Sequence, residues 1–448
     1  MADVRFYGGI GEIGGSKILL EDGDTKVWLE FGQSFGSGED YFTGWLQPRS
    51  VAGAKDYFEF GLVPKTPGLY SKEALRFTDL KYSKPAFDAI FISHPHYDHI
   101  ARLDLVDSSI PVHISRVAKV AVNAIEQSSQ IKFGEHDYRP FDPGKKIKVG
   151  SIEVIPMSVD HSAPGACGFI IHTSGGTVVY TGDFRMHGPS AELTEKFVSA
   201  MVREKPSAMI CEGTRMSVAE RQRYVGGEKD VRVKSREFLS DAKKLAAATF
   251  YPRDVDRMAT FVHVAKDIGR KLVLSPRAAL LLTSLAKEGL DVPKIGRDYL
   301  VYARRKESGG YLDKDYDKWE RPFIDGALKA DDIHKRQKDF LLNLDFYHFA
   351  EFVDIKPDQG SHFVYSMSEP YPEEEFETQV MLNWLRHFKL RFHQVHSSGH
   401  CSRREIEKIV REVNPKHLFP IHSEHPELFH GLVKGVHEKI EVGKAYEF

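Results

Sequence analysis

The sequence FISHPHYDHI, residues 91–100, places three histidines and one aspartate within six consecutive positions. These residues are His94, His96, Asp98 and His99, and they directly follow the apolar run FDAIFIS. Because such a run is typical of a buried strand, we expect the four side chains on the loop that leaves its carboxyl end. Extended backbone would send His94 and His96 to one side, and the following turn would bring the other two to the opposite side.

Imidazole and carboxylate groups suit zinc, manganese or iron. Four such groups at this spacing exceed what one ion would take from a single loop, so the motif predicts two adjacent ions. The alternative is a chance cluster of surface histidines, which the order of the residues behind an apolar strand disfavours.

Three further ligand-type residues follow other apolar runs. They are His161 in VIPMSVDHSAPGA, Asp183 in VVYTGDFRMHG and His422 in HLFPIHSEHPE. Taken singly, each would be an ordinary polar loop residue. With the first motif they make five histidines and two aspartates, enough to hold two ions ~3.5–4 Å apart with a bridging water or hydroxide.

Composition limits the class of protein. The 448 residues are 41% hydrophobic and 28% charged, which is typical of a soluble globular protein with two or three domains. No long apolar segment and no secretion signal are recognisable, so we expect no membrane span. Three isolated cysteines fit a reducing cytoplasm. With a net charge of −2, attraction to nucleic acid would have to come from a local groove.

The pattern of predicted secondary structure changes along the chain. The first 190 residues predict β-hairpins, with turns at Asp22-Gly23, Gly150-Ser151 and Gly175-Gly176. From about Glu204 strands alternate with helices, which indicates a parallel sheet with crossover helices. Residues 35–82 are expected to form an extended functional loop, and residues 302–358 a charged, irregular surface decoration.

HPHYDH, followed by His161 and Asp183, resembles the signature of the metallo-β-lactamase fold. The remainder is similar to the β-CASP branch of nucleases, whose further motifs are matched by Glu212 in ICEGTRM, His400 in HSSGHCS and His422 in FPIHSE. The opening GGIGEIGGS and the HSSGHCS loop resemble ribonuclease J most closely, in a compact archaeal form.

The resemblance implies an α/β fold, namely a metallo-β-lactamase αββα sandwich with an inserted Rossmann-like β-CASP domain. The sandwich is expected over residues 1–204 and 376–448, and the inserted domain over residues 205–375. A homodimer in the cytoplasm is implied as well.

The same resemblance implies two divalent metal ions, Zn²⁺ first and Mn²⁺ as the alternative. In this scheme His94, His96 and His161 hold one ion, Asp98, His99 and His422 hold the other, and Asp183 bridges them. Asp98, Glu212 and His400 are the expected catalytic residues. A carboxylate on one imidazole nitrogen favours the protonated ring, so His400 could donate to the leaving 3′ oxygen.

One residue departs from the family pattern. Glu30 stands where family members usually carry an aspartate, and its extra methylene means that its contact with the metal loop has to be arranged differently.

For the substrate, the resemblance implies single-stranded RNA held largely through phosphates. The expected phosphate-binding residues are Ser397, Ser398, Gly399 and His400, with Arg253, Arg257 and Arg277 along the RNA channel. For these three arginines a role in stability is the alternative. His422 in the last motif is typical of RNA-processing rather than DNA-repair members.

The predicted activity is a 5′-3′ exoribonuclease that prefers 5′-monophosphate ends, with endonuclease activity in addition, serving RNA degradation and rRNA processing. The alternatives are an endoribonuclease of the RNA 3′-end cleavage type, a small-molecule hydrolase of the same fold, and a non-catalytic RNA-binding subunit.

Overall fold

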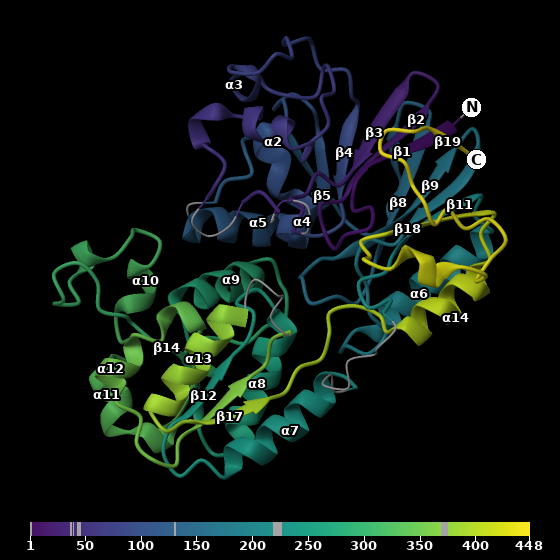
Figure 1. Cartoon of the computed structure of the whole chain (residues 1–448). Helices are drawn as coiled ribbons and strands as arrows, with labels where there is room; N and C mark the ends of the chain where they lie inside the picture. The colour runs from purple at the N-terminus through teal and green to yellow at the C-terminus, as the bar shows by residue number, and fades with distance from the viewer. Residues whose placement is uncertain are drawn as a thin grey trace. The chain divides into compact units, whose positions relative to one another are not determined.

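The computed structural model describes residues 2–35, 38, 40–42, 46–129, 131–217, 226–368 and 375–448. The chain divides into two compact units (Figure 1). Unit 1 comprises residues 1–119, 131–220 and 399–448, and unit 2 comprises residues 120–130 and 221–398. The units thus change over near residues 220 and 398, whereas the sequence placed domain limits after residues 204 and 375. As limits of separate domains, those positions remain a prediction.

Unit 1 contains two sheets. The first has the order β19-β1-β2-β3-β4-β5-β6 and the second the order β18-β11-β10-β9-β8-β7. The strands of the first are β1 (Ala2–Gly8), β2 (Lys17–Asp22), β3 (Thr25–Leu29), β4 (Ala89–Ile92), β5 (Val112–Ser115), β6 (Tyr138–Phe141) and β19 (Tyr446–Glu447). Those of the second are β7 (Ile147–Val149), β8 (Ile152–Ser158), β9 (Cys167–Thr173), β10 (Gly176–Tyr180), β11 (Ala208–Glu212) and β18 (His417–Ile421).

The two sheets face each other across one hydrophobic core. Phe6 and Phe91 of the first sheet pack in the same cluster as Phe169 and Phe419 of the second, and all four are fully buried. On the outer face of the second sheet, α6 (Ala191–Glu204) and α14 (Arg403–Val413) bury their apolar sides (Figure 1). This arrangement is the metallo-β-lactamase sandwich that the resemblance implied.

The predicted hairpins are confirmed. The pairs Asp22–Thr25, Val149–Ile152 and Thr173–Gly176 each close a two-residue connection. The connection Gly150-Ser151 is the expected one, and the other two, Gly23-Asp24 and Ser174-Gly175, lie one residue from the expected positions. Residues 35–82 differ from the extended loop that we expected, because the described part contains α2 (Lys55–Glu59), α3 (Lys72–Leu75) and a 3₁₀ turn at Ser50–Ala52. Residues 36, 37, 39 and 43–45 of this segment lie outside the described ranges.

Unit 2 is built on a parallel sheet of six strands with the order β14-β13-β15-β12-β16-β17. Its strands are β12 (Ala246–Thr249), β13 (Lys271–Leu274), β14 (Tyr299–Val301), β15 (Phe340–Asn343), β16 (His362–Tyr365) and β17 (Arg391–Gln394). The predicted parallel sheet with crossover helices is confirmed, since every pairing is parallel.

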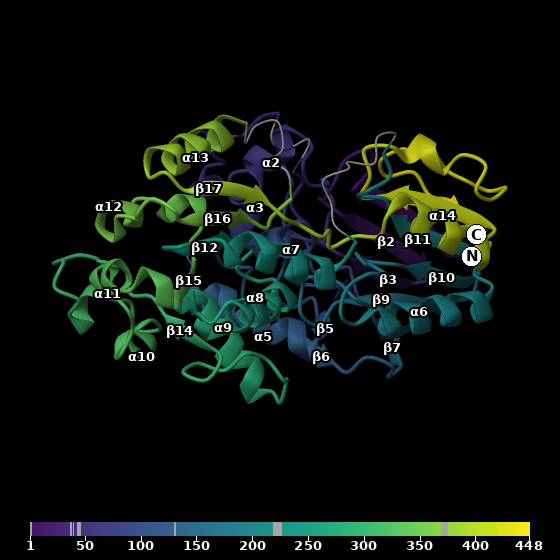
Figure 2. The same cartoon turned by 90° about the horizontal axis from the view of Figure 1, so that it is seen from below.

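Helices cover both faces of this sheet (Figures 1 and 2). One face is covered by α11 (Ala330–Lys335), α12 (Glu351–Ile355) and α13 (Glu375–His387), and the other by α7 (Glu228–Ser240) and α8 (Val255–Asp267). Two further helices are α9 (Pro276–Lys287) and α10 (Arg321–Ile324). In the described ranges, no helix combines the length and the hydropathy needed to cross a membrane.

The segment 302–358 was expected to be irregular surface decoration, and this expectation was wrong in part. β15 lies inside the sheet between β12 and β13, and α11 and α12 contribute Ile333 and Phe352 to the core. The run FLLN is only four residues long and is surrounded by charges, so its burial depends on neighbouring strands that local sequence does not reveal.

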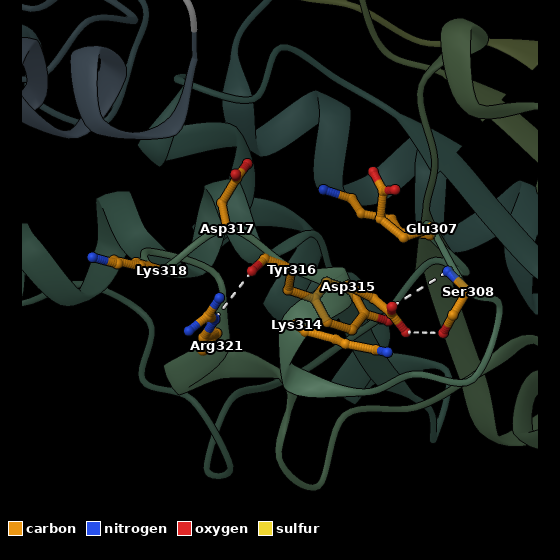
Figure 3. A pocket seen from close by; sticks show the side chains of 9 residues that line it. Glu307, Ser308, Lys314, Asp315, Tyr316, Asp317, Lys318 and Arg321 are labelled. Carbon is orange, nitrogen blue, oxygen red and sulfur yellow. Dashed lines mark hydrogen bonds between the residues drawn. The ribbon is translucent and has the colours of Figure 1, made fainter.

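The first part of that segment does form a polar hollow (Figure 3). Its volume is about 560 Å³, and its lining includes Lys306, Lys314, Lys318 and Arg321. Several of the charged groups are engaged within the segment. Lys306 Nζ donates to Glu320 at 2.7 Å, and Arg321 Nε donates to the Tyr316 carbonyl at 3.1 Å. Because these charged groups bind partners within the same segment, we assign no function to this hollow.

Lys17 at the start of β2 is a buried cation. Only 1% of its surface is exposed, and Nζ donates to the Gly15 carbonyl at 2.8 Å. Burial lowers the pKa of Lys17 from 10.5 to about 8, against the opposing charge of Glu12. Between these two pH values the unfolded chain keeps a proton that the folded chain has lost, so the free energy of unfolding rises with pH across this window.

Replacing this cation should stabilise the fold near neutral pH. We expect Lys17→Met to raise the free energy of unfolding at pH 7 by about 2 kcal/mol, the cost of the buried charge less that of one hydrogen bond. The gain should shrink as the pH rises from 8 to 10.5, because the folded side chain has then lost its proton. Urea unfolding at pH 7, 9 and 10.5 measures it, with the exposed Lys148→Met as control. A gain that is equal at every pH would contradict this origin.

Candidate metal centre

The candidate ligands stand where strands of unit 1 end. His94 and His96 follow β4, and α4 (Tyr97–Ile100) carries Asp98 and His99. The other three, His161, Asp183 and His422, follow β8, β10 and β18. Because β10, β11 and β18 are parallel neighbours, their carboxyl ends lie on one edge of the second sheet.

At this edge the seven side chains come together in two groups that share Asp183. One group contains His94, His96, His161 and Asp183, and the other contains Asp98, His99, Asp183 and His422. Within each group the ligand-type atoms lie within 4.8 Å of one another. The groups have the members that the resemblance implied for the two ions, and the assignment of ions to them is a proposal.

Asp183 lies at the centre of the cluster. Its Oδ2 is 3.3 Å from His99 Nε2, 3.5 Å from His94 Nε2 and 4.0 Å from His161 Nε2. The same oxygen is 3.9 Å from His422 Nε2, which lies 2.8 Å from Asp98 Oδ2. One carboxylate therefore faces candidate ligands from three other loops.

The donor set fits a divalent cation. Asp183 Oδ1 and the Nε2 atoms of His94 and His99 are buried, and none has a hydrogen-bond partner among the described residues. Buried polar atoms without partners are costly, and their common aim at one point is explained by an ion that binds there. Imidazole and carboxylate together suit a transition metal such as zinc or manganese.

The electrostatics of the cluster lead to the same conclusion. Burial alone would lower the pKa of His99 and His422, but the carboxylates of Asp183 and Asp98 outweigh it. As a result the pKa of His99 lies well above its usual value, and that of His422 rises to about 9. Protons thus compete with metal for these ligands, and binding of a cation would release them.

The ligand rings are oriented by groups that sequence reasoning missed. Ser93 Oγ lies 2.9 Å from His94 Nδ1, and Thr214 Oγ1 lies 2.8 Å from His422 Nδ1. Contacts of this kind fix the ring orientation and leave the other nitrogen for a metal. Ser93 adjoins its histidine in sequence and was recognisable, whereas Thr214 is 208 residues from His422 and carried no signal.

Glu30 contacts the loop of residues 93–99 (the metal loop), which carries four of the candidate ligands. It is buried with a φ of 63°, and its carboxylate accepts a hydrogen bond from the Ser93 amide at 3.0 Å. Its Oε1 also lies 3.6 Å from His99 Nδ1. From this left-handed position directly after β3, the glutamate side chain reaches the loop that carries Ser93 and His99.

Glu212 and His400 form a pair beside Asp183. His400 Nδ1 is 3.1 Å from Glu212 Oε1 and 3.9 Å from Asp183 Oδ2. Glu212 is held by the amides of Phe184 and Thr214, which donate to its two carboxylate oxygens at 3.2 and 3.0 Å. Burial would lower the pKa of His400, but Glu212 and Asp183 raise it above the usual value. The pair can therefore keep a proton on this ring.

The expected phosphate-binding residues run through the end of unit 2 into unit 1. Ser397 and Ser398 are buried in unit 2, and Ser397 Oγ has no hydrogen-bond partner among the described residues. In unit 1, the Gly399 carbonyl lies 2.7 Å from His161 Nδ1. A Cβ at Gly399 would come within 2.9 Å of Ser162 Oγ, so this close approach favours glycine.

The three arginines of unit 2 differ from one another. Arg253 is half-buried beside Tyr251, and Arg277 is exposed with Nη2 donating to the Ser128 carbonyl at 3.0 Å. Arg257 is completely buried, and its guanidinium is bonded to Glu228, Ser366 and Ser397. The expectation that Arg257 contacts RNA does not fit this burial, which instead supports the alternative role in stability. The roles of Arg253 and Arg277 remain predictions.

A glycine determines how close the metal loop can approach. A Cβ at Gly32 would lie 1.6 Å from the Asp98 carbonyl oxygen and 2.6 Å from the His99 amide nitrogen. The neighbouring Phe31 amide donates to the His99 carbonyl at 2.9 Å, so the backbone cannot withdraw without losing this contact.

Gly32→Ala should therefore displace α4 and its two ligands. We expect metal affinity to fall about 10- to 100-fold and stability to fall by about 1–3 kcal/mol. Metal titration and thermal unfolding measure the two effects. Gly23→Ala is the control for metal affinity, because its φ of 62° makes alanine destabilising there while the added Cβ has nothing within 4 Å. Unchanged metal affinity in Gly32→Ala would show that the loop tolerates the displacement.

Comparison with known proteins identifies the relatives of this chain. Residues 67–238 match the β-lactamase superfamily domain, and residues 386–430 match the Zn-dependent metallo-hydrolase RNA specificity domain. A crystal structure of a protein of unknown function from Enterococcus faecalis V583 is similar over 100% of both chains, with a TM-score of 0.79 and 23% identity. The chain thus contains a region similar to the β-lactamase superfamily domain, and its candidate metal ligands include His94, His96, Asp98 and His99 of that region.

Named relatives extend this comparison. The chain is 22% identical to ribonuclease J of Thermus thermophilus over 74% of its own length, and it spans only 57% of that protein. It is 23% identical to ribonuclease J of Pyrococcus abyssi, over 87% of this chain and 83% of that protein. The chain is thus similar to ribonuclease J over most of its own length, and it spans between 57% and 83% of these two relatives.

Proposed function

We propose that this chain is a two-metal ribonuclease that degrades single-stranded RNA from 5′ to 3′, starting at 5′-monophosphate ends. The observation that carries the proposal is the convergence of six ligand-type side chains on Asp183, the seventh, beside the Glu212–His400 pair. The expected ions are two Zn²⁺, with Mn²⁺ as the alternative. Ions of this kind would activate a water molecule and neutralise charge on the phosphate.

The side chains near the candidate metal site would supply the proton that the leaving group needs. Water attacks phosphorus, the bond to the 3′ oxygen breaks, and that oxygen needs a proton. Glu212 faces His400 Nδ1, so the proton on Nε2 is the one that His400 would transfer to the leaving oxygen. Asp98 would hold the same ion as His422, whose Nε2 lies 2.8 Å from Asp98 Oδ2.

Recognition of the RNA end is assigned to the 397–400 loop. The unpartnered Ser397 Oγ and the glycine at 399 suit a phosphate group, which accepts hydrogen bonds from hydroxyls and backbone amides. The match of residues 386–430 to an RNA specificity domain supports RNA as the substrate. A homodimer of archaeal type in the cytoplasm, acting in RNA degradation and rRNA processing, completes the proposal.

The proposal is tested with one single-stranded RNA labelled at its 5′ end in one sample and at its 3′ end in another. The 3′-labelled strand carries a 5′ monophosphate, triphosphate or hydroxyl, and Zn²⁺ or Mn²⁺ is added. We expect mononucleotide release from the 5′ end, fastest for the monophosphate. Discrete internal fragments that are independent of the 5′ group would establish an endoribonuclease instead. Tight RNA binding without cleavage by either metal would mean a non-catalytic subunit.

A further inference from the structure

A buried ion pair joins two of the ligand loops. Arg185 follows Asp183 by two residues, and Asp160 directly precedes His161. Arg185 Nε donates to Asp160 Oδ1 at 2.8 Å, and each side chain is only 1% exposed. The backbones are bonded as well, because the Arg185 amide donates to the Asp160 carbonyl at 2.8 Å. The loops that carry His161 and Asp183 are thus connected twice.

The pair is also anchored to the start of α6. Asp160 Oδ2 accepts from the Ser190 amide at 3.2 Å, and the Asp160 amide donates to Thr194 Oγ1 at 2.9 Å. A Cβ at Gly188 would lie 2.2 Å from Arg185 Nε and 2.5 Å from Asp160 Oδ1, so the chain passes close over the pair. The Asp160 carboxylate therefore accepts a hydrogen bond on each oxygen, and its backbone amide donates another.

A contribution to the stability of the fold does not by itself explain a buried ion pair. Removing two charges from water costs about as much as their attraction returns, and apolar side chains of similar volume would often stabilise the fold more. What the ion pair provides is direction, since each bond is short and has a defined geometry. The ion pair therefore fixes the orientation of the chain next to Asp183, the one side chain that both groups of candidate ligands share.

We propose that Arg185 and Asp160 are positioning residues that hold His161 and Asp183 at the separation required by the metal pair. The proposal rests on the metal assignment of the proposed function. His161 belongs to the group with His94 and His96, so loss of the pair should weaken binding of that ion most. The ion beside Asp98, His99 and His422 should be affected less, through Asp183 alone.

The test uses the full chain and Mn²⁺ without RNA, so that it does not depend on cleavage. In Arg185→Met we expect the affinity for one of two Mn²⁺ ions to fall about 10- to 100-fold. At one equivalent of added metal per site, electron paramagnetic resonance should change from the spectrum of an exchange-coupled pair to that of isolated ions. Arg185→Lys, which keeps the charge, should recover part of the affinity, and Asp160→Asn, which keeps an acceptor for Nε, should recover more.

A destabilised control separates positioning from folding. Leu20→Ala removes a fully buried side chain of β2 in the same unit, and it should lower the melting temperature while both Mn²⁺ affinities stay native. Native affinities and a coupled spectrum in Arg185→Met would overturn the proposal. If Arg185→Met does not fold, Asp160→Asn and Arg185→Lys decide in its place. Native affinity for both ions in these two variants, or a loss of affinity that Leu20→Ala shares, would equally overturn the proposal. Native metal binding in a chain that does not cleave RNA would instead count against the proposed function alone.

Discussion

Asp183→Asn is expected to lower the rate of RNA cleavage by about a thousand-fold, which corresponds to a loss of roughly 4 kcal/mol of transition-state stabilisation. The amide has the volume of the carboxylate but not its charge, and Oδ2 is the atom nearest to the imidazoles of both ligand groups. Without that charge, the chain should bind fewer than two metal ions, because the two groups share no other side chain.

Metal content per chain and single-turnover cleavage of 5′-monophosphorylated RNA measure the two effects. Asp22→Asn is a matched control, since Asp22 is a buried aspartate of unit 1 that accepts from the Ser174 amide at 3.0 Å. This control should lose stability and keep its metal and its activity. Two bound ions with native activity in Asp183→Asn would remove Asp183 from the centre of the site.

Glu212→Gln should keep the metal ions and lower the cleavage rate about 10²- to 10⁴-fold, the range attributed to proton transfer by a positioned acid or base. Glutamine preserves the volume and an acceptor for the Phe184 amide. It removes the negative charge that lies 3.1 Å from His400 Nδ1 and that favours the protonated ring. The leaving 3′ oxygen would then lack its proton donor.

A substrate with sulfur in place of the bridging 3′ oxygen isolates this effect, because a thiolate leaves without needing a proton. We expect the sulfur substrate to restore most of the rate in Glu212→Gln and in His400→Ala, with no such rescue in Asp183→Asn. The double variant Glu212→Gln/His400→Ala should be no slower than His400→Ala alone, since the two residues act as one unit. Equal deficits on both substrates would show that Glu212 serves the metal site and not the leaving group.

The sequence by itself determined the features that depend on neighbours along the chain. Turn residues with alternating apolar runs predicted the hairpins near Asp22-Gly23 and at Gly150-Ser151. The candidate ligands were also recognisable, because each is a histidine or aspartate placed directly after an apolar strand. These patterns involve only residues that are close in sequence, so they can be recognised without knowledge of the fold.

Only the tertiary structure decided which of these side chains meet and which are buried. Arg257 has the sequence surroundings of an RNA-binding arginine, yet Glu228 and Ser366 enclose it. The strand β15 is too short to be recognised, and it becomes central because β12 and β13 pair with both of its edges. The pairs Thr214–His422 and Asp160–Arg185 join residues that are far apart in sequence. Such contacts depend on how the sheets and loops pack, and that packing is a property of the whole chain.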